Sequence, residues 1–263
     1  MSKKAVISLS GGLDSTMLLM TLLSEGYEVR AYAFDYGQKH TIELEKLQKN
    51  IIFLQKKKHL PVTLQVINLR DCFSESASSL CSFNNAEIPH ARYDHESQKE
   101  TVVEQRNVIF SAIIYGKALG WSKKTNSDVL ISLGLHANDT SVYPDTTPES
   151  QEAARHLFKI SNWGSERVDY IAPFININKA QVLERGVEAM GDMNFSEEDV
   201  NYILQNTHSC YSPDREGRSC GKCGTCQERI ASFAINNMFD PLAYSVDDEE
   251  LKKLYLKYKE QGL

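Results

Sequence analysis

A short glycine turn near the N-terminus constrains the fold of this chain more than any other feature. Residues 5–9 are mostly apolar and predict a strand, and residues 16–23 repeat apolar side chains at helical spacing. Between them lies the hexapeptide Ser10-Gly11-Gly12-Leu13-Asp14-Ser15. Two glycines let the backbone turn sharply and approach a ligand closely. The first amides of the following helix have no partner within the helix and favour an anion. The order of strand, glycine turn and helix therefore predicts a phosphate site.

The polar residues of the hexapeptide indicate what it binds. Ser10 and Ser15 provide hydroxyl donors for phosphate oxygens, whereas the carboxylate of Asp14 repels phosphate unless a magnesium ion lies between them. The turn is not a Walker loop, because no Lys-Ser or Lys-Thr pair follows the glycines, and it is not the dinucleotide-binding Gly-x-Gly-x-x-Gly motif. A plainer interpretation is an Asp or Ser cap on an ordinary helix.

The rest of the chain alternates strand and helix patterns. Further strands are expected over residues 28–36, 62–69, 128–135 and 170–174. Helices are expected over 38–60, over 106–119 with Gly120 beyond the end, from 148 onward, and over 178–190, 197–204, 226–236 and 247–260. This alternation predicts an α/β fold with a parallel sheet flanked by helices. Residues 72–105, rich in Ser, Asn and His, interrupt the pattern as an irregular insert.

Four of the six cysteines are clustered near the C-terminal end, at Cys210, Cys220, Cys223 and Cys226. Their spacing suits tetrahedral zinc, and the intervening glycines allow turns that direct backbone amides at sulfur. Four sulfurs leave no open position, so the site should be structural; an iron–sulfur cluster and four unligated thiols are the alternatives. We expect an α/β domain over residues 1–195 and a small helical, zinc-bearing subdomain with the C-terminal helix over 196–263.

Net charge and hydropathy restrict the partners of this chain. A net charge of −6 opposes broad binding to nucleic acid. No apolar run approaches the ~20 residues that a membrane span needs. The N-terminal residues lead directly into the first strand without the apolar core of a signal peptide. We therefore expect a cytoplasmic protein that binds neither nucleic acid nor a membrane.

A set of motifs in a fixed order resembles one enzyme family. The hexapeptide matches the signature of the ATP pyrophosphatases, the PP-loop superfamily. Over residues 6–233 the chain further resembles their queuosine-pathway branch, the 7-cyano-7-deazaguanine synthases. The matching blocks are Ser10 to Thr16, Phe34 to His40, Arg106-Asn107, Tyr143-Pro144-Asp145 with Pro148-Glu149, Pro173 to Asn176 with Lys179-Ala180, and Thr207 to Tyr211 with the cysteine cluster.

The resemblance implies a fold like the adenine-nucleotide α-hydrolases, a structural zinc and a homodimer. It also implies a ligase that uses ATP and magnesium to adenylate the carboxylate of 7-carboxy-7-deazaguanine. Ammonia then gives the amide, and a second ATP converts the amide into the nitrile. The residue chemistry agrees, because a carboxylate needs a phosphoryl leaving group. The glycine turn can hold the pyrophosphate that is expelled from the α-phosphorus.

The resemblance also suggests roles for individual residues. The predicted catalytic residues are Asp14, which steers magnesium, and Lys179 and Arg106, which neutralise phosphate charge. The predicted ATP-binding residues are Ser8, Leu9, Ser10, Gly11, Gly12, Leu13, Asp14, Ser15, Thr16 and Phe34. The predicted substrate contacts are Tyr36, Gln38, His40, Asn107, Tyr143 and Asp145. Asp145 is the candidate for the guanine-like edge, since a carboxylate accepts two N–H bonds. Plainer alternatives are a solvated Lys179, a structural ion pair for Arg106, core packing for Phe34, a surface position for His40 and a turn aspartate at Asp145.

The chain departs from the family pattern at three places. Glu104-Gln105 replaces a proline and a small residue, Ser141-Val142 replaces Ser-Gly, and Thr146-Thr147 replaces Cys-Arg. The helix over 247–260 extends past the usual end of the family. These differences leave open a paralogue that stops at the amide or transfers the acyl group to an amine such as a protein N-terminus. A tRNA-thiolating pyrophosphatase and a non-catalytic zinc-knuckle module that binds nucleic acid are further alternatives, which the net charge opposes.

Overall fold

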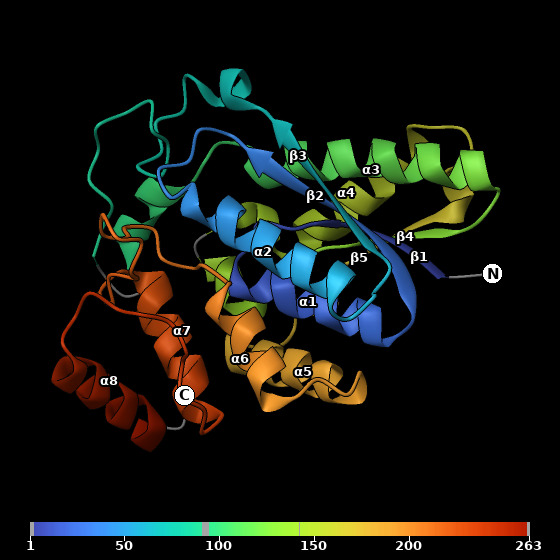
Figure 1. The fold of residues 1–263 in the computed structure, drawn as a ribbon. Helices are drawn as coiled ribbons and strands as arrows, with labels where there is room; N and C mark the ends of the chain where they lie inside the picture. The colour runs from blue at the N-terminus through green and yellow to red at the C-terminus, as the bar shows by residue number, and fades with distance from the viewer. Residues whose placement is uncertain (1–2, 91–94, 142, 262–263) are drawn as a thin grey trace.

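The computed structural model describes residues 3–90, 95–141 and 143–261, and in this part of the chain five strands form one parallel sheet (Figure 1). The sheet has the order β3-β2-β1-β4-β5. Its strands are β1 (Lys3–Ser8), β2 (Tyr27–Asp35), β3 (Val62–Asn68), β4 (Val129–Ser132) and β5 (Val168–Ile171). The order reverses between β1 and β4, and open α/β sheets bind ligands at the carboxyl ends of the strands on either side of such a point.

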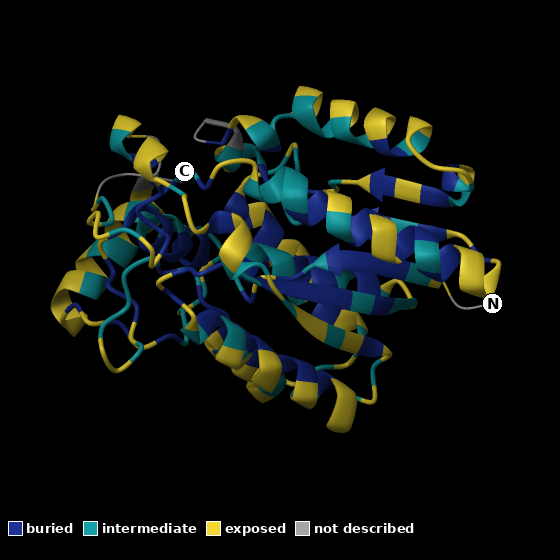
Figure 2. Ribbon diagram, turned by 90° about the horizontal axis from the view of Figure 1, so that it is seen from above, coloured by how far each residue is buried: buried dark blue, intermediate teal, exposed yellow. Residues whose placement is uncertain are grey.

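The side chains of β1 enter two hydrophobic cores, one on each face of the sheet. Ala5 and Ile7 belong to the core covered by α1 (Leu13–Ser24), α2 (Ile42–Lys56) and α5 (Lys179–Asp192). Val6 points the other way, into the core covered by α3 (Arg106–Thr125) and α4 (Pro148–Ile160). All three side chains are fully buried, and Figure 2 shows buried strands between helices with exposed outer faces. Burial on both faces is typical of a parallel sheet and confirms the predicted α/β fold.

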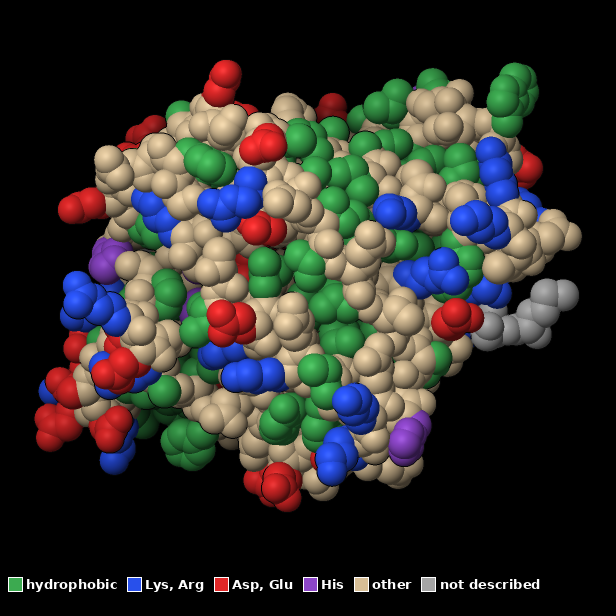
Figure 3. Space-filling model, turned by 45° about the horizontal axis from the view of Figure 1, so that its top comes forward, with side chains coloured by type: hydrophobic (Ala, Val, Ile, Leu, Met, Phe, Trp, Pro, Cys, Tyr) green, Lys and Arg blue, Asp and Glu red, His purple; other side chains and the backbone are tan. Residues whose placement is uncertain are grey.

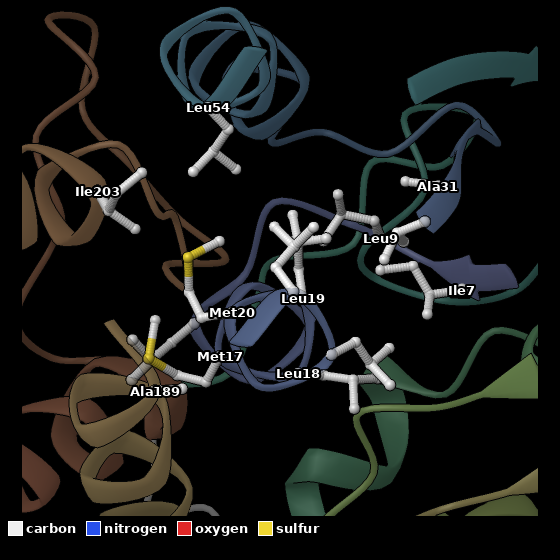
Figure 4. Close-up of a cluster of buried hydrophobic side chains, with 14 of the residues drawn as sticks. Ile7, Leu9, Met17, Leu18, Leu19, Met20, Ala31, Leu54, Ala189 and Ile203 are labelled. Atoms are coloured by element: carbon white, nitrogen blue, oxygen red, sulfur yellow. The ribbon is translucent and has the colours of Figure 1, made fainter. Parts of the chain in front are cut away.

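Helix α1, which carries the hexapeptide at its start, is enclosed by neighbouring elements. In Figure 4, Met17 lies beside Ala189 of α5, and Met20 extends toward Ile203 of α6 (Glu197–Gln205). A Cβ atom at Gly186 would lie 2.1 Å from the Met17 sulfur, so α5 approaches α1 as closely as only glycine allows. This enclosure fixes the position of the turn that precedes α1.

The C-terminal region packs on the α/β core through α6 and α7 (Gly224–Ile235). Phe233 of α7 lies in the core around α1. The fully buried Arg229 donates to both oxygens of Asp240, at 2.6 and 3.0 Å, and to the Leu204 carbonyl. Helix α8 (Asp248–Gln261) packs on the cysteine region through Leu251 and Leu254. The predicted terminal helix is confirmed, whereas the division of the chain after residue 195 stays a prediction.

Several predicted boundaries of helices and strands are wrong. Helix α2 ends at Lys56 rather than near residue 60. Strand β4 is shorter than the predicted 128–135, and β5 covers Val168–Ile171 rather than 170–174. Helix α3 continues five residues past Gly120, because Trp121 and Ser122 are buried on its inner face, and it ends at Asn126 with φ 48°. Helix α2 begins at Ile42 rather than near residue 38. Among its described residues, the predicted insert contains short 3₁₀ turns, at Arg70–Phe73 and Glu96–Thr101, and one antiparallel β-bridge from Cys81 to Gln38. Further 3₁₀ turns are Ala137–Ser141, Pro144–Thr146 and Ser165–Arg167.

Over the described ranges, no helix is both long enough and apolar enough to span a membrane. The face of the molecule in Figure 3 carries basic and acidic side chains intermixed. A mixed surface of this kind agrees with the modest net charge of −6.

Candidate active site

A pocket lies at the carboxyl ends of β1, β2 and β4, where the strand order reverses. The first turns of α1, α3 and α5 and the loop before the cysteine cluster complete its wall. Most of the predicted site residues line it together, namely Ser8, Ser10, Gly12, Asp14, Ser15, Phe34, Tyr36, His40, Arg106, Asn107, Tyr143 and Lys179. The lining also contains residues for which no ligand contact was predicted, including Glu43, Phe110, Asp139, Thr146, His208 and Tyr211.

The hexapeptide turns tightly against the start of α2. Gly11 has φ +93°, and a Cβ atom there would lie 2.7 Å from the Glu43 carbonyl oxygen. The Gly12 amide donates to Ser10 Oγ at 3.1 Å, and the Ser10 and Ser15 hydroxyls lie 3.1 Å apart. Helix α1 begins after Gly12 without a side-chain cap, so the alternative of an Asp or Ser cap is wrong. The amides of its first turn remain suited to an anion.

Four of the predicted ATP-binding residues support this turn from behind and do not line the pocket. Leu9 and Leu13 are fully buried in the core, and Gly11 provides the turn itself. The Thr16 hydroxyl donates to the Gly12 carbonyl at 2.8 Å. Any contact of these residues with a ligand is therefore through backbone atoms or indirect.

Lys179 connects the hexapeptide to the C-terminal helices. A capping box of Asn178 and Gln181 starts α5 and places Lys179 at its first position. Its Nζ lies 3.1 Å from Asp14 Oδ2 and 2.9 Å from Glu228 Oε2 on α7, and only 5% of the residue is exposed. Burial alone would lower the pKa of Lys179, but Asp14 and Glu228 outweigh it and raise that pKa. The alternative of a solvated lysine is wrong, and nothing in the sequence distinguishes Glu228 from an ordinary helix residue.

His136 holds Asp14 from the other side and was not predicted. Its Nε2 lies 3.7 Å from Asp14 Oδ2 and 3.6 Å from Asp139 Oδ1. Burial would lower the pKa of His136, but Asp139 and Asp14 outweigh it and raise the pKa to about 9. Burial would conversely raise the pKa of Asp14, but Lys179 and His136 hold it well below its usual value. Asp14 is thus ionised at neutral pH.

Asp14 also has an oxygen that suits a cation. Its Oδ1 is buried and has no hydrogen-bond partner among the described residues. Asp139, whose carboxylate lies near the same His136 nitrogen, lines the same pocket. Ionised carboxylate oxygens are the ligands that magnesium prefers, so the residues present fit this ion.

An aromatic group and one cation form the wall beside β2 and α3. Phe34 and Phe110 stack with ring centroids 3.9 Å apart, and both line the pocket. Arg106, the first residue of α3, donates to the Tyr36 hydroxyl at 3.2 Å. In the described part of the chain Arg106 forms no ion pair within 4.0 Å, so the alternative of a structural ion pair finds no support. Its guanidinium is a positive charge available to the pocket.

Gln38 lies behind the pocket wall and holds Glu43, which lines it. Gln38 Nε2 donates to the Phe34 carbonyl at 3.1 Å and to Glu43 Oε1 at 3.0 Å, while its Oε1 accepts from the Tyr36 amide at 2.9 Å. His40 Nε2 lies 3.7 Å from Glu43 Oε2. Because His40 is 5% exposed, the alternative of a surface position is wrong. Gln38 is therefore not among the lining residues, whereas Glu43, to which it donates, is.

Some residues of the loop after β4 line the pocket, and others do not. Tyr143 and Thr146 line the pocket, and the Thr146 hydroxyl donates to the Tyr143 carbonyl at 2.7 Å. Asp145 is half-buried and is not among the lining residues, and its carbonyl accepts from Gln151 at the next helix. The prediction that Asp145 contacts the substrate is therefore not supported, because the turn places its neighbours in the pocket instead. Val142 lies outside the described residues.

The four clustered cysteines are buried and close together. Their sulfur atoms all lie within 4.8 Å of one another, with 3.9 Å between Cys220 and Cys226 and 4.0 Å between Cys210 and Cys223. Zinc–sulfur bonds of about 2.3 Å in a tetrahedron place the sulfurs about 3.8 Å apart, so the set fits a zinc ion. Amides of the knuckle donate to the sulfurs, including that of Lys222 to Cys220 at 3.4 Å. The four cysteines would fill all four coordination positions of a tetrahedral ion, as a structural site requires.

Comparison with known proteins agrees with this geometry. The profile of the family described as "Queuosine biosynthesis protein QueC" matches residues 4–237. The chain belongs to this family. A 7-cyano-7-deazaguanine synthase of Marinomonas sp. (strain MWYL1) is 37% identical over 246 residues, which cover 93% of this chain and 99% of that relative. The synthase of the same name from Archaeoglobus fulgidus is 36% identical over 257 residues, 98% of this chain and 95% of the relative. The 7-cyano-7-deazaguanine synthase of Caldicellulosiruptor bescii is 34% identical over 244 residues, which cover 93% of this chain and 98% of that relative. The predicted family is confirmed.

The residues that depart from the expected family pattern have structural roles in this chain. Glu104 accepts from the Ser76 hydroxyl at 2.6 Å and the Ala77 amide at 3.1 Å, which ties the insert to the start of α3. Gln105 has φ 55° immediately before that helix. Thr147 caps α4 by accepting from the Ser150 amide at 3.2 Å. Of the substitutions that have described side chains, Thr146 is the one that reaches the pocket lining.

Proposed function

We propose that this member of the QueC family converts 7-carboxy-7-deazaguanine into 7-cyano-7-deazaguanine, with ATP and ammonia. The observation that carries the proposal is one pocket in which the Ser10–Ser15 turn, the Lys179–Asp14 pair and a polar, aromatic wall meet. A ligase of this kind must hold a triphosphate and a planar base next to each other. The printed names of the relatives describe this activity for those proteins.

ATP would bind with its phosphates on the hexapeptide and its adenine near Phe34. The unsatisfied amides of α1 and the charge of Lys179 would stabilise the pyrophosphate as negative charge develops on it. Arg106 would supply a second positive charge. The proposed ATP-binding residues remain Ser8, Leu9, Ser10, Gly11, Gly12, Leu13, Asp14, Ser15, Thr16 and Phe34.

Asp14 and Asp139 would hold magnesium at the phosphate end of the pocket. When bound, the ion would neutralise charge on the phosphate oxygens. His136 and Lys179 would keep the Asp14 carboxylate ionised and fixed in place.

The base would occupy the wall formed by Tyr36, His40, Asn107, Tyr143 and Tyr211. A carboxylate oxygen of the base attacks the α-phosphorus of ATP, and pyrophosphate leaves. Ammonia attacks the acyl carbon of the adenylate, AMP leaves, and a proton is lost to give the amide. The amide oxygen attacks the α-phosphorus of a second ATP, and pyrophosphate leaves. The adenylated amide then loses AMP and its two N–H protons to give the nitrile. The residues named here would orient the two reactants, and such positioning contributes to catalysis together with electrostatic stabilisation.

The test is to incubate the protein with ATP, magnesium, ammonium and 7-carboxy-7-deazaguanine, and to follow AMP and the mass of the base. We expect the nitrile. A product that stays at the amide, or appears only when an amine acceptor is added, would support the specialised paralogue instead. Absence of both AMP and any change in the mass of the base would refute adenylation of this substrate. The predicted homodimer stays a prediction.

A further inference from the structure

Glu43 is a buried carboxyl group on the pocket wall that has no role in binding phosphate. It lies in the first turn of α2, and only 7% of the residue is exposed. The ion pairs of the described residues give it one neighbour, His40, at 3.7 Å. Burial, reinforced by His208 and Arg106, lowers the pKa of His40 to about 3, so that imidazole is neutral. Glu43 thus has no cationic partner within 4.0 Å among the described residues, although the more distant charge of Arg106 acts on it. The ionised form of this buried carboxyl is therefore costly unless a ligand supplies donors.

The position of the Glu43 carboxyl is fixed by the surrounding structure. Gln38 Nε2 donates to two protein acceptors, the Phe34 carbonyl and Glu43 Oε1. Gln38 Oε1 accepts from the Tyr36 amide. This network sets the orientation of Gln38 and, through it, of Glu43. The Glu43 carbonyl lies against Gly11 of the hexapeptide, so the carboxyl stays at a constant place relative to the proposed phosphate site. Fixed groups of this kind confer specificity at little entropic cost.

The other acidic side chains of the pocket are already engaged. Among the described residues that line it, the carboxylates are those of Asp14, Glu43 and Asp139. Asp14 is held by Lys179 and His136, and Asp139 by His136, at the phosphate end. Glu43 is therefore the carboxyl group on the base side of the pocket.

A guanine-type base presents two adjacent N–H donors, on N1 and on the exocyclic amine. A carboxylate accepts two such bonds at once, and each of its oxygens has two acceptor positions, so Oε1 can keep the bond from Gln38. We infer that Glu43 reads the N1–H and amine edge of the deazapurine, the role that the sequence had suggested for Asp145. This inference rests on the proposed function.

The protonation state of Glu43 in the free pocket leads to a second expectation. Burial raises the pKa of Glu43 to about 8, against the hydrogen bond from Gln38 and the charge of Arg106. The groups that face it are Arg106, the Tyr36 hydroxyl and the neutral His40. The Glu43 carboxyl therefore keeps its proton at neutral pH when the pocket is free. The two N–H donors of a bound base favour its ionised form instead. Binding of the base should then release a proton.

The experiment compares Glu43→Gln with the wild type on the deazaguanine carboxylate and on the analogue that lacks the exocyclic amine. Glu45→Gln, the same change at an exposed position two residues away, is the matched control. We expect Glu43→Gln to lower kcat/KM on the amine-bearing base about 5- to 150-fold, mainly through KM. The preference of the wild type for the amine should largely disappear in this variant and persist in Glu45→Gln.

Retention of the full preference for the amine in Glu43→Gln would overturn the inference. If the variant does not fold, calorimetry of the wild type without ATP decides instead. Binding of 7-carboxy-7-deazaguanine at pH 7, in buffers of different ionisation enthalpy, should release a proton, and no release would overturn the inference. Failure of the proposed function is distinguishable, because the wild type would then form no AMP with this base.

Discussion

Replacing Lys179 by methionine removes a positive charge that lies between two carboxylates, with little change in side-chain volume. Nζ lies 3.1 Å from Asp14 and 2.9 Å from Glu228, and the lysine side chain is 6% exposed. Removing one partner of a buried pair costs about 3–5 kcal/mol, because the remaining charge is left uncompensated. We expect a loss of this size in the free energy of unfolding. Because Lys179 is also proposed to stabilise the leaving pyrophosphate, AMP formation should fall at least about 100-fold.

Lys159→Met is the matched control for this prediction. Lys159 pairs with Asp169 at 3.3 Å, but the two side chains are 37% and 69% exposed. An exposed pair of this kind contributes about 0.2–1 kcal/mol. Urea denaturation and the initial rate of AMP release measure both quantities for each variant. A Lys179→Met variant as stable and as active as Lys159→Met would refute the assigned role of the Lys179 network.

Three further predictions concern the zinc site, a buried ion pair and pH. Cys223→Ser should abolish binding of one zinc per chain, measured by mass spectrometry of the metal, whereas Cys72→Ser should retain it, and equal metal content would contradict the site. Asp240→Asn should cost about 3–5 kcal/mol in urea denaturation, since it leaves the buried Arg229 without its carboxylate; a loss below about 1 kcal/mol would show that the pair is not buried in solution. The folded pKa of Glu43, about 8, lies above its unfolded value, so stability is fully present at low pH and falls as pH rises toward 8. Relative to Glu43→Gln, the wild type should lose up to about 1.4 kcal/mol per pH unit over this range, and parallel pH curves would contradict the shift.

The fold class could be predicted from the sequence, because turns, strands and helices are largely determined by residues that are neighbours in the chain. The hexapeptide predicted a turn between β1 and α1, and strand–helix alternation predicted a parallel sheet. Predictions failed where tertiary contacts decide, as at Gly120, which looks like a helix end but lies within α3 because Trp121 after it is buried. A Cβ atom at Gly120 would meet nothing within 4 Å, so packing does not require glycine there.

The site was predictable in part for the same reason. Lys179 and Asp14 each belong to a motif that the sequence shows, and in the structure they form an ion pair at 3.1 Å. His136 and Glu228 come from elements far apart in the sequence, and only the fold shows that His136 contacts Asp14 and Glu228 contacts Lys179. In the sequence Glu43 resembles any acidic residue in the first turn of a helix. Its burial depends on residues outside that helix, among them Gly11 and Gln38.

The most direct test of the proposed chemistry follows the oxygen atoms of the substrate. Both carboxylate oxygens of 7-carboxy-7-deazaguanine are labelled with ¹⁸O, and the products with ATP, magnesium and ammonium are analysed by mass spectrometry. Two successive adenylations predict one ¹⁸O in each of two AMP molecules and none in the nitrile. Label that stays in the base, or appears in pyrophosphate or inorganic phosphate instead of AMP, would contradict the account.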